Sequence, residues 1–349
     1  MAMAEIEVFG GGVFGLSVAY ALLKKGARVR LIEKRAIGAG SSGGVVGALA
    51  PHTPDNWNDK KQFQLESLLA AESYWAEVDR LSGLSSGYGR IGRLSTIGTH
   101  RGLVLARERE KSAKEFWGDN ARWRVVHASD FPGWAPIGAV GFLTHDTLSA
   151  RLSPKGAALS LAEAIRALGG EIVEGQTEGK GADAVVLCTG YEGLEELSIE
   201  LGTEVGNGVK GQGLSVACPI KGKPQLYANA LHIIPHADGT VAIGSTSENQ
   251  WSDPVSVDEQ LDALHTRAVE LCPVLRDAPI VRRWAGVRPR GHKRAPMLGR
   301  HPTRENVFIA NGGFKIGFGV SVKVGEVMAD LVLNGQAEIP DSFTVEANL

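Results

Sequence analysis

Residues 6–33, IEVFGGGVFGLSVAYALLKKGARVRLIE, decide the fold of this chain. The stretch predicts a buried strand, a glycine turn, an amphipathic helix and a second strand. Gly10, Gly12 and Gly15 have the spacing G-x-G-x-x-G. The first glycine permits a tight turn, the second lets backbone approach a pyrophosphate, and the third lets helix and strand pack closely. Glu33 ends the second strand, where a carboxylate would accept hydrogen bonds from an adenosine ribose, so the stretch predicts a dinucleotide site.

Two further matches to the same spacing show how specific the pattern is. Residues 38–43 (GAGSSG) and 206–211 (GNGVKG) also read G-x-G-x-x-G. Neither match is flanked by a predicted strand and by a helix that leads to an acidic residue, and the spacing alone also occurs in ordinary glycine-rich turns. Only the first match has the context of a dinucleotide site.

Length, composition and charge narrow the class of protein. The chain has 349 residues, 43% of them hydrophobic, which is enough to bury the core of one large domain or two moderate ones. The formal net charge of −2 gives no overall attraction to nucleic acid, so we expect no such partner. The three cysteines form no C-x-x-C pair, and no apolar run of about 18 residues predicts a transmembrane segment. The first strand begins too near Met1 for a signal peptide, and we expect a soluble cytoplasmic protein.

A long loop rich in glycine and serine, KRAIGAGSSGGVVGALAPHTP, follows at residues 34–54. Its backbone N–H groups and the hydroxyls of Ser41 and Ser42 suit phosphate oxygens, and its glycines let a flat ring lie against backbone. A nicotinamide cofactor has no evident use for such a loop. A flavin, whose ring lies beyond the pyrophosphate, does, so the loop favours FAD.

The rest of the chain predicts a second domain and further helices and strands. Between residues 205 and 285, alternating apolar runs and an amphipathic helix predict an antiparallel sheet with a covering helix, the usual form of a substrate-binding domain set into a dinucleotide fold. We expect helices over 61–81, 103–116, 153–169, 257–271 and 322–333, and strands over 87–98, 123–127, 140–142, 171–173, 184–187, 214–217, 231–235, 241–243 and 306–311.

A second glycine loop, GGFKIGFG at residues 312–319, precedes the last expected helix. Lys315 in this loop could bring a positive charge to the N1/C2=O edge of a flavin, where a cation stabilises the anionic reduced ring. The alternative is an ordinary strand-to-helix loop with a solvated lysine. The residues by themselves favour neither interpretation.

The segment WAGVRPR at residues 284–290 places Arg288 between an apolar run and a proline. An arginine in this setting can grip a substrate carboxylate through two parallel hydrogen bonds. The basic residues that follow, Arg290, Lys293 and Arg294, are more commonly solvated loop charges, and their contact with substrate stays open.

Three histidines lie close to these segments in the sequence. His52 follows the first glycine loop and could line a substrate cavity, although a loop histidine bonded to backbone is the commoner arrangement. His232 and His236 flank Pro235 in an expected strand, where a pair facing one side could reach a ligand. Strand histidines reach a ligand less often than they serve a structural role.

Taken together, these motifs resemble the D-amino-acid oxidase family of FAD-dependent oxidoreductases, in particular its glycine oxidase and sarcosine oxidase branch. The resemblance implies a fold of α/β plus α+β type: a Rossmann-like FAD-binding domain (GR2 type) over residues 1–85, 146–205 and 286–349, and an inserted antiparallel-sheet substrate domain over 86–145 and 206–285. It covers nearly the whole chain and is carried by the segments VFGGGVFGLSVAYALLKKG, IEKR, GSSGGVVGAL, AVVLCTG, VKGQG, IIPHADGTVAIGSTSE, WAGVRPR and GGFKIGFGVS.

The resemblance also implies roles for individual residues. Arg288 stands where the family holds the substrate carboxylate, and Lys315 and His52 are the other candidates for catalysis. The residues expected to contact FAD are Gly10, Gly12, Val13, Phe14, Gly15, Glu33, Lys34, Ser41, Ser42, Gly47, Ala48, Leu49, Val173, Thr189, Gly190, Gly313, Phe314, Lys315, Ile316 and Gly317.

The chain departs from the family pattern in two respects. Sarcosine oxidases of the family attach their flavin through a cysteine near the C-terminal glycine loop, whereas Cys272 is the last cysteine here and lies outside that loop. The resemblance therefore implies noncovalent FAD. The segment AVVLCTG follows Val173 after a short hairpin, which implies that some family elements are trimmed.

The implied activity is oxidation of an amine that bears an α-carboxylate, such as glycine, an N-substituted glycine or a D-amino acid. The α-hydrogen would move as hydride to flavin N5, the imine would hydrolyse to an oxo acid and an amine or ammonia, and oxygen or another acceptor would take the electrons. Two alternatives remain: a hydroxy-acid dehydrogenase of the same fold, and a flavoprotein that demodifies carboxymethylaminomethyl-uridine in tRNA, which the segment GALAPHTP resembles. The exact substrate, the electron acceptor and a possible oligomeric state stay open.

Overall fold

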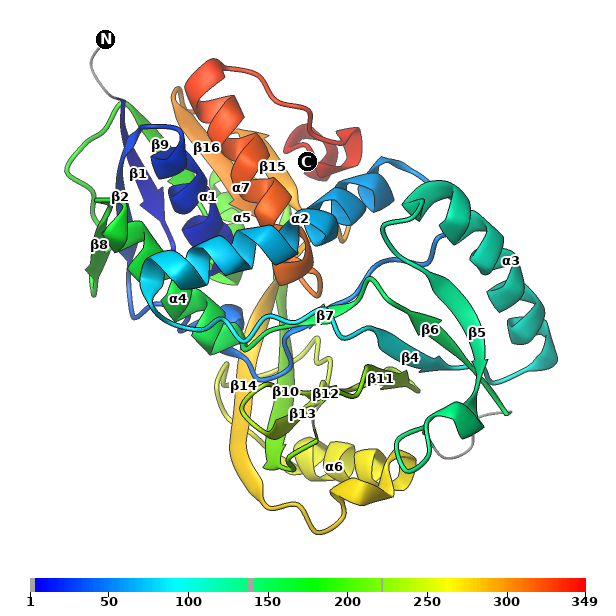
Figure 1. Cartoon of the computed structure of the whole chain (residues 1–349). Coiled ribbons are helices and arrows are strands. Elements are labelled where there is room, and N and C mark those ends of the chain that lie inside the picture. Colours follow the sequence, from blue (N-terminus) through cyan, green and yellow to red (C-terminus); the bar gives the residue numbers. More distant parts are fainter. Residues whose placement is uncertain (1–3, 137–140, 221) are drawn as a thin grey trace.

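The computed structural model describes residues 4–136, 141–220 and 222–349. Its strands form a six-stranded sheet, an eight-stranded sheet and a two-stranded sheet. Figure 1 shows the six-stranded sheet and its helices in one part of the molecule and the eight-stranded sheet in the other. The two-stranded sheet pairs β3 (Ala48–Leu49) with β7 (Ala150–Arg151) in antiparallel fashion. This arrangement of two large sheets is the combination of α/β and α+β patterns that the sequence predicts.

The six-stranded sheet is parallel except at one edge, where β15 runs antiparallel to β16. The glycine-containing βαβ unit lies near its centre, so the carboxyl ends of β1, β9 and β16 meet at the same edge. In order across the sheet, the strands are β15 (Met297–Arg300), β16 (Val307–Asn311), β9 (Ala184–Leu187), β1 (Glu5–Phe9), β2 (Arg28–Glu33) and β8 (Glu171–Glu174).

Helices cover one face of this sheet. Ile6 and Val8 of β1 point to this face and are buried in one hydrophobic core with the helices. α4 begins as the sequence predicts, because the Ser153 hydroxyl accepts a hydrogen bond from Gly156 N and Pro154 occupies the first helical position. The helices of this layer are α1 (Val13–Lys24), α4 (Pro154–Ala167) and α7 (Gly317–Asn334), with α2 (Asp59–Ser82) packed against α4 and α7.

The opposite face of the six-stranded sheet is covered less completely. α5 (Gly190–Leu201) packs Leu194 against Ile309 of β16. Nearer the centre of the sheet, Phe9 and Leu187 belong to this face and are only partly buried. Parallel sheets normally have both faces covered, so these side chains form the floor of an open cavity.

The eight-stranded sheet is antiparallel except for the parallel pair β11 and β4. Leu214 and Ile243 from the sheet pack with Leu261 of α6 in a second core, which confirms the expected covering helix. In order, the strands are β14 (Ile280–Gly291), β10 (Gly206–Ala217), β13 (Thr240–Gly244), β12 (Leu231–Pro235), β11 (Gln225–Ala228), β4 (Arg93–Thr96), β6 (Phe142–Asp146) and β5 (Trp123–His127), and the helices are α3 (His100–Trp117) and α6 (Glu259–Leu271).

One strand differs from expectation in a way that affects the domain division. β14 contains the whole WAGVRPR segment and pairs with β10 as far as the Gly206 and Gly291 partners. The glycines, arginines and proline in β14 break the alternation by which a strand is recognised in sequence. A boundary at residue 286 would cut this strand, and we propose residue 291 instead.

The sequence did not predict α5, β3, β7, β11 or β15, and β10 begins at Gly206, eight residues before the expected start at 214. The other predicted elements agree with expectation within a few residues, with three exceptions. The expected strand over 87–98 is reduced to β4, and α7 begins at Gly317, so the last glycines of the second loop form its first turn. The expected strand over 140–142 begins outside the described residues, and β6 starts at Phe142. Single-turn 3₁₀ helices lie at Ser41–Gly43, Ala128–Asp130, Pro273–Leu275, Asp341–Phe343 and Glu346–Asn348.

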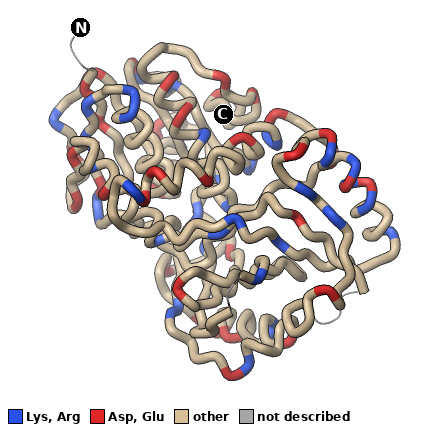
Figure 2. The backbone as a smooth tube through the Cα atoms, in the orientation of Figure 1, with Lys and Arg blue, Asp and Glu red and all other residues tan. Residues whose placement is uncertain are grey.

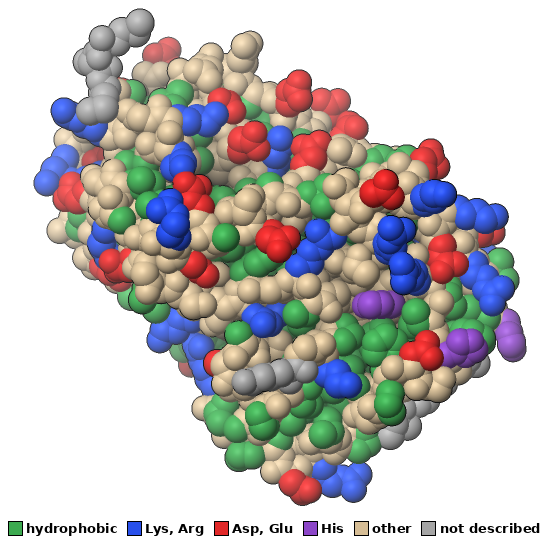
Figure 3. Space-filling view, viewed as in Figure 1, with side chains coloured by type: hydrophobic (Ala, Val, Ile, Leu, Met, Phe, Trp, Pro, Cys, Tyr) green, Lys and Arg blue, Asp and Glu red, His purple; other side chains and the backbone are tan. Residues whose placement is uncertain are grey.

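Charges and apolar side chains are distributed differently over the surface. Figure 2 shows acidic and basic residues interspersed over both parts of the molecule, with both signs along α3. Figure 3 shows hydrophobic side chains gathered in the lower part of the view, where Figure 1 places α6. Within the described ranges, no helix combines the length and apolarity that would be needed to cross a membrane.

Candidate functional site

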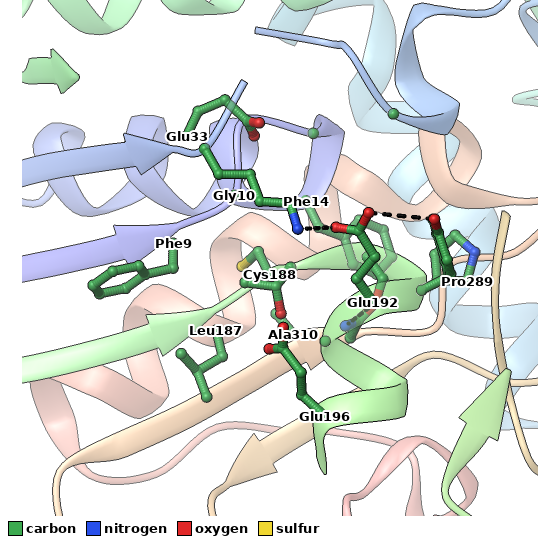
Figure 4. A pocket seen from close by; sticks show the side chains of 18 of the residues that line it. Phe9, Gly10, Phe14, Glu33, Leu187, Cys188, Glu192, Glu196, Pro289 and Ala310 are labelled. Carbon is green, nitrogen blue, oxygen red and sulfur yellow. Dashed lines mark hydrogen bonds and ion pairs between the residues drawn. The ribbon is translucent and has the colours of Figure 1, made fainter. Parts of the chain in front are cut away.

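A cavity of about 830 Å³ lies along the carboxyl edge of the six-stranded sheet, and we call it the first cavity. Its lining includes Gly10 and Glu33 from the βαβ unit, Gly286 from β14 and Gly317 at the start of α7. Figure 4 shows side chains from the strands on one side of it and Glu192 on α5 on the other. This edge of a parallel sheet is where α/β folds bind dinucleotides.

The glycine turn at one end of the first cavity depends on the absence of side chains. Gly10 has φ +108°, and a Cβ there would lie 2.3 Å from the carbonyl oxygen of Cys188. A Cβ on Gly15 would lie 1.9 Å from the oxygen of Gly10, which confirms close packing of helix on strand. Gly12 meets only the Ser42 hydroxyl and faces the cavity, so backbone is open to a ligand there.

The first turn of α1 supplies donors for an anion. Val13 N donates to Ser42 Oγ at 2.9 Å, which ties the glycine- and serine-rich loop at residues 34–54 to the helix. The first turn of α1 contains no acidic residue. Because the first N–H groups of a helix lack intrahelical acceptors, a phosphate beside Gly12 would accept hydrogen bonds from them.

Glu33 lies beneath this end of the cavity and is buried. Its Oε2 accepts a hydrogen bond from Gly11 N at 2.6 Å, and its Oε1 accepts one from Arg35 N at 2.8 Å. A carboxylate has about four acceptor positions, so both oxygens retain capacity for ribose hydroxyls. The backbone bonds therefore orient the carboxylate without occupying it.

A second cavity of about 540 Å³ lies between the eight-stranded sheet and the second glycine loop. It lies next to Ala48 and Ile316, which were expected to flank the flavin. Its polar lining residues are Thr53, Gln64, Arg93, Ser95, Thr96, Arg109, Thr144, Tyr227, Asn229, His232 and Lys315.

Positive charge is concentrated at this second cavity. Burial, and then the charges of Arg288, Arg290 and Arg294, lower the pKa of Lys315. Burial, and then the charges of Arg93, Lys315 and Arg288, lower the pKa of His232 to about 3, so this imidazole is neutral at physiological pH. Arg93, His232 and Lys315 line this cavity, and Arg288 is near enough to contribute to the lowered pKa of both His232 and Lys315.

Arg288 is fixed on β14 just behind the cavity wall. Its Nη2 donates to Ser245 Oγ at 2.8 Å and its Nη1 to the carbonyl oxygen of Thr246 at 3.3 Å. A Cβ on Gly211 would lie 2.0 Å from Arg288 Nη1, so the glycine of the VKGQG segment makes room for the guanidinium. Burial lowers the pKa of Arg288 to about 10, and Glu248 opposes that effect, so the group is cationic at neutral pH.

Two other arginines of the cavity have carboxylate partners. Arg93 Nε donates to Asp146 Oδ2 at 3.1 Å, and its Cζ lies 5.7 Å from the centroid of the Tyr227 ring. Arg109 bonds Asp55 Oδ2 through Nε at 3.0 Å and Nη2 at 2.8 Å. Sequence reasoning missed Arg93, Arg109 and Tyr227, because no local motif marks them.

Most residues expected to bind cofactor are brought together. The first cavity is lined by Gly10, Gly12, Val13, Phe14, Glu33, Lys34, Ser41, Ser42, Thr189, Gly190, Gly313, Phe314 and Gly317, and the second by Ala48, Lys315 and Ile316. Gly47 has φ +63° and packs against Leu152, Leu49 is fully buried in the core, and Val173 pairs with Ile32, so these three lie behind the cavity walls.

His52 is not brought to the cavity. It is exposed, its backbone N donates to Gln64 Oε1 at 2.8 Å, and its Nδ1 lies 2.5 Å from the same oxygen. Burial of the ring nitrogens lowers the pKa of His52. The local bond to Gln64 explains the placement, since Gln64 rather than His52 lines the second cavity.

The first cavity fits an extended dinucleotide with a flavin at its far end. A glycine turn without Cβ atoms, the N-terminus of α1 and the carboxylate of Glu33 would receive its adenosine diphosphate half. Gly313 and Gly317 leave backbone open where a flat ring would lie, next to the second cavity. The donor set is therefore that of an FAD site.

Comparisons with known proteins agree with this geometry. Glycine oxidase of Geobacillus kaustophilus is 25% identical, over 94% of this chain and 92% of its own. Glycine oxidase of Pseudomonas putida is 27% identical, over 99% of each chain. The crystal structure of the Geobacillus kaustophilus enzyme has a TM-score of 0.84 at 23% identity and covers 98% of this chain and 99% of its own.

Further solved structures share the fold. Iminodiacetate oxidase of Chelativorans has a TM-score of 0.83 at 22% identity, with 97% of this chain and 98% of its own covered. An L-α-glycerophosphate oxidase of Mycoplasma pneumoniae, solved with FAD bound, has a TM-score of 0.74 at 14% identity, with 98% and 97% covered. The family described as FAD dependent oxidoreductase matches residues 5–331. With nearly the whole chain matched, this protein belongs to the DAO family of FAD-dependent oxidoreductases.

Proposed function

We propose that this chain oxidises a small amine that carries an α-carboxylate and transfers the electrons to FAD. Several relatives are named glycine oxidase, and one protein of the same fold is named iminodiacetate oxidase. Both names denote amines with a carboxylate on the neighbouring carbon. Because these proteins share only about a quarter of their residues with this chain, the proposal rests on the second cavity itself.

The observation that carries the proposal is an excess of positive charge at the second cavity. Arg93 and Arg109 are paired with carboxylates, whereas within the described ranges no carboxylate forms an ion pair with Lys315 or Arg288. Desolvated like charges repel one another, and an anionic ligand relieves that repulsion. The carboxylate of a small amine substrate is an anion that would do so.

Bound FAD would supply an acceptor for the hydride, which carries both electrons of the oxidation. Two N–H groups of Arg288 already donate to Ser245 and Thr246. The chain itself would hold the carboxylate between Lys315 and the other N–H groups of Arg288. His232 lines the cavity and is neutral, and its buried Nδ1 has no partner among the described residues, so the ring keeps an unused hydrogen-bonding position. The pKa of His232 is too low for it to accept a proton at neutral pH, and no Asp or Glu belongs to the described lining.

It follows that the amine would enter in its neutral form, with its proton lost to solvent. The α-hydrogen then leaves with both bonding electrons, the C=N bond forms, and water hydrolyses the imine to an oxo acid and an amine or ammonia. Positioning of the substrate, rather than a side-chain base, would supply most of the contribution of this chain to the rate.

Anaerobic titration of the purified flavoprotein tests this function. Glycine, sarcosine, iminodiacetate, D-alanine and L-proline are added in turn while the flavin absorbance is followed. We expect at least one of these amines to bleach the flavin, and the matching 2-hydroxy acids to leave it oxidised. Bleaching by hydroxy acids alone would contradict the proposal.

We further propose that FAD is held without a covalent bond. All three cysteines are buried, and only Cys188 belongs to the described lining of either cavity. It lies at the glycine-turn end, and burial raises the pKa of its thiol well above the ordinary range. Denaturation in acid should therefore release all of the flavin into the supernatant.

Alcohol oxidation is the second candidate function, because an L-α-glycerophosphate oxidase shares the fold. The same titration with glycerol 3-phosphate and 2-hydroxy acids decides between the two. A tRNA substrate would need an extended basic face, whereas Figure 2 shows both signs of charge interspersed on the described part of the chain.

A further inference from the structure

An ion-pair bridge crosses the first cavity at its glycine-turn end. Glu192, at the start of α5, accepts a hydrogen bond from Arg35 Nη1 at 2.9 Å on Oε1 and pairs with Lys34 Nζ through Oε2. Lys34 and Arg35 directly follow β2, on the other side of the cavity. All three residues belong to the cavity lining, and Figure 4 shows the Glu192 carboxylate reaching into the cavity with contacts on two sides.

The bridge is charged and held at both ends. Burial alone would raise the pKa of Glu192, but the hydrogen bonds from Lys34 and Arg35 outweigh it and lower that pKa below its ordinary value. Burial alone would lower the pKa of Arg35, and the hydrogen bond that Arg35 donates to Glu192 instead leaves it raised. The hydroxyl of Tyr191 also donates to Glu192 Oε1 at 3.3 Å, which restricts the carboxylate further.

The position of the bridge matters more than its strength. The Glu192 side chain is 22% exposed, and those of Lys34 and Arg35 are 41% and 50% exposed, so the pairs are partly screened by solvent. They nevertheless connect the wall that carries Glu33 with the wall formed by α5. A dinucleotide whose ribose reaches Glu33 must pass between these walls in order to leave.

We infer that Glu192, Lys34 and Arg35 form a clasp that retains FAD by closing the first cavity over its adenosine half. The clasp is a positioning device for the cofactor and takes no part in the oxidation of substrate. Release of FAD requires the ion pairs to open, and their opening is favoured by salt, because counterions screen exposed charges within about 10 Å at 0.1 M ionic strength. The inference depends on the FAD site and not on the identity of the substrate.

The test measures release of FAD from the intact holoenzyme of Glu192→Gln. Flavin fluorescence is followed after dilution, with an excess of an FAD-binding apoprotein, apo-glucose oxidase, present to trap the free cofactor. At low ionic strength we expect release to be about fivefold faster than in the natural chain, the size typical of a partly exposed ion-pair network. Raising the salt concentration should speed release from the natural chain towards the rate of the variant, and should change the rate of the variant little.

Glu195→Gln is the matched control. Glu195 is an exposed acid on the same turn of α5 as Glu192, and burial and then the charge of Glu192 raise its pKa, so it lies near the clasp without belonging to it. This variant should release FAD at the natural rate and with the natural dependence on salt. If Glu192→Gln behaves in the same way as this control, the clasp has no part in retention and the inference is overturned.

A double-mutant cycle with Arg35→Gln separates a clasp from a contact that only stabilises α5. In a clasp, the double variant Glu192→Gln/Arg35→Gln releases FAD no faster than Glu192→Gln alone, because both changes open the same pair. Rates that multiply would overturn the inference. A merely structural contact would lower the melting temperature of the apoprotein and leave the salt dependence of release unchanged, which would also overturn it.

Discussion

The glycine turn of the first cavity presents backbone to its ligand, whereas the second cavity presents side chains. Gly10, Gly12 and Gly15 shape the first by lacking Cβ atoms, and the N–H groups of α1 supply its donors. The second is shaped by long cationic side chains, with Lys315 inside it and Arg288 behind its wall. Backbone recognition fixes one cofactor firmly, and side-chain recognition can change with few substitutions.

This contrast explains why the two cavities respond differently to change. A backbone site fails when a side chain enters it, since backbone atoms cannot move aside. A side-chain site fails when a charge is removed, since the ligand then loses a partner while the fold remains. The following predictions test this difference, in order of decreasing expected effect.

Gly15→Val should abolish FAD binding and lower the free energy of unfolding by about 3 kcal/mol. The added Cβ would lie 1.9 Å from the backbone oxygen of Gly10, so α1 would have to shift away from β1. Flavin absorbance and thermal denaturation measure the two effects. Gly98→Ala is the control, because a Cβ there meets nothing within 4 Å. A yellow Gly15→Val protein of natural stability would contradict the backbone account of the first cavity.

Arg288→Met should raise KM for carboxylated amines by about 100-fold, equivalent to about 3 kcal/mol, and leave FAD bound. The variant keeps the volume of the side chain but removes the charge that is fixed by Ser245 and Thr246. Steady-state kinetics measure KM. Arg283→Met changes an exposed arginine on the same strand that pairs with Asp262, and it should leave KM unchanged. Equal KM values for both variants would show that Arg288 does not bind the substrate carboxylate.

Lys315→Met should raise KM by about tenfold at neutral pH, the size expected for one charged hydrogen bond. In the natural chain the pKa of Lys315 lies below the ordinary 10.5. Lysine is cationic below its pKa, so affinity for a carboxylate should be present at neutral pH and fall as pH rises through that lowered value. Lys315→Arg should move the loss to higher pH. A KM that is independent of pH in this range would show that Lys315 does not touch the carboxylate.

His232→Gln should have the smallest effect, a rise in KM of about fivefold, because an amide can replace one neutral hydrogen bond of an imidazole. The pKa of His232 is about 3 rather than the ordinary 6.5, so no step near pH 6.5 should appear in the profile of kcat/KM for the natural chain. If such a step appears and is lost in His232→Gln, the imidazole titrates and has an acid or base role that its burial does not predict.

The two cavities also differ in how far they could be predicted from sequence. The first follows from local spacing: a turn needs glycine at fixed positions, and the strand ending in Glu33 follows after one helix. His52 was expected at the cavity and lies outside it. Local sequence does not show that its ring would bond Gln64, which lies in the following helix, α2. Leu49 and Val173 were expected at the cofactor and lie behind the wall, since a motif marks a segment and not the direction of each side chain.

The second cavity draws its residues from strands that are far apart in the chain. Arg93 belongs to β4, Tyr227 to β11 and His232 to β12, and they meet only when the parallel pair β4 and β11 forms. No spacing of residues in the sequence predicts the pairing of β4 with β11. Arg288 could be singled out because proline and an apolar run flank it, but the opening made for it by Gly211 required the register of β10 against β14.

The partly covered face of the six-stranded sheet has a consequence for the protein inside a cell. Phe9 and Leu187 form an apolar floor that a bound ligand would shield, so FAD would complete the hydrophobic core as well as the active site. A chain made when riboflavin is scarce would present that floor to chaperones and proteases. The abundance of this protein should therefore follow the supply of the vitamin, even where its gene is transcribed at a constant rate.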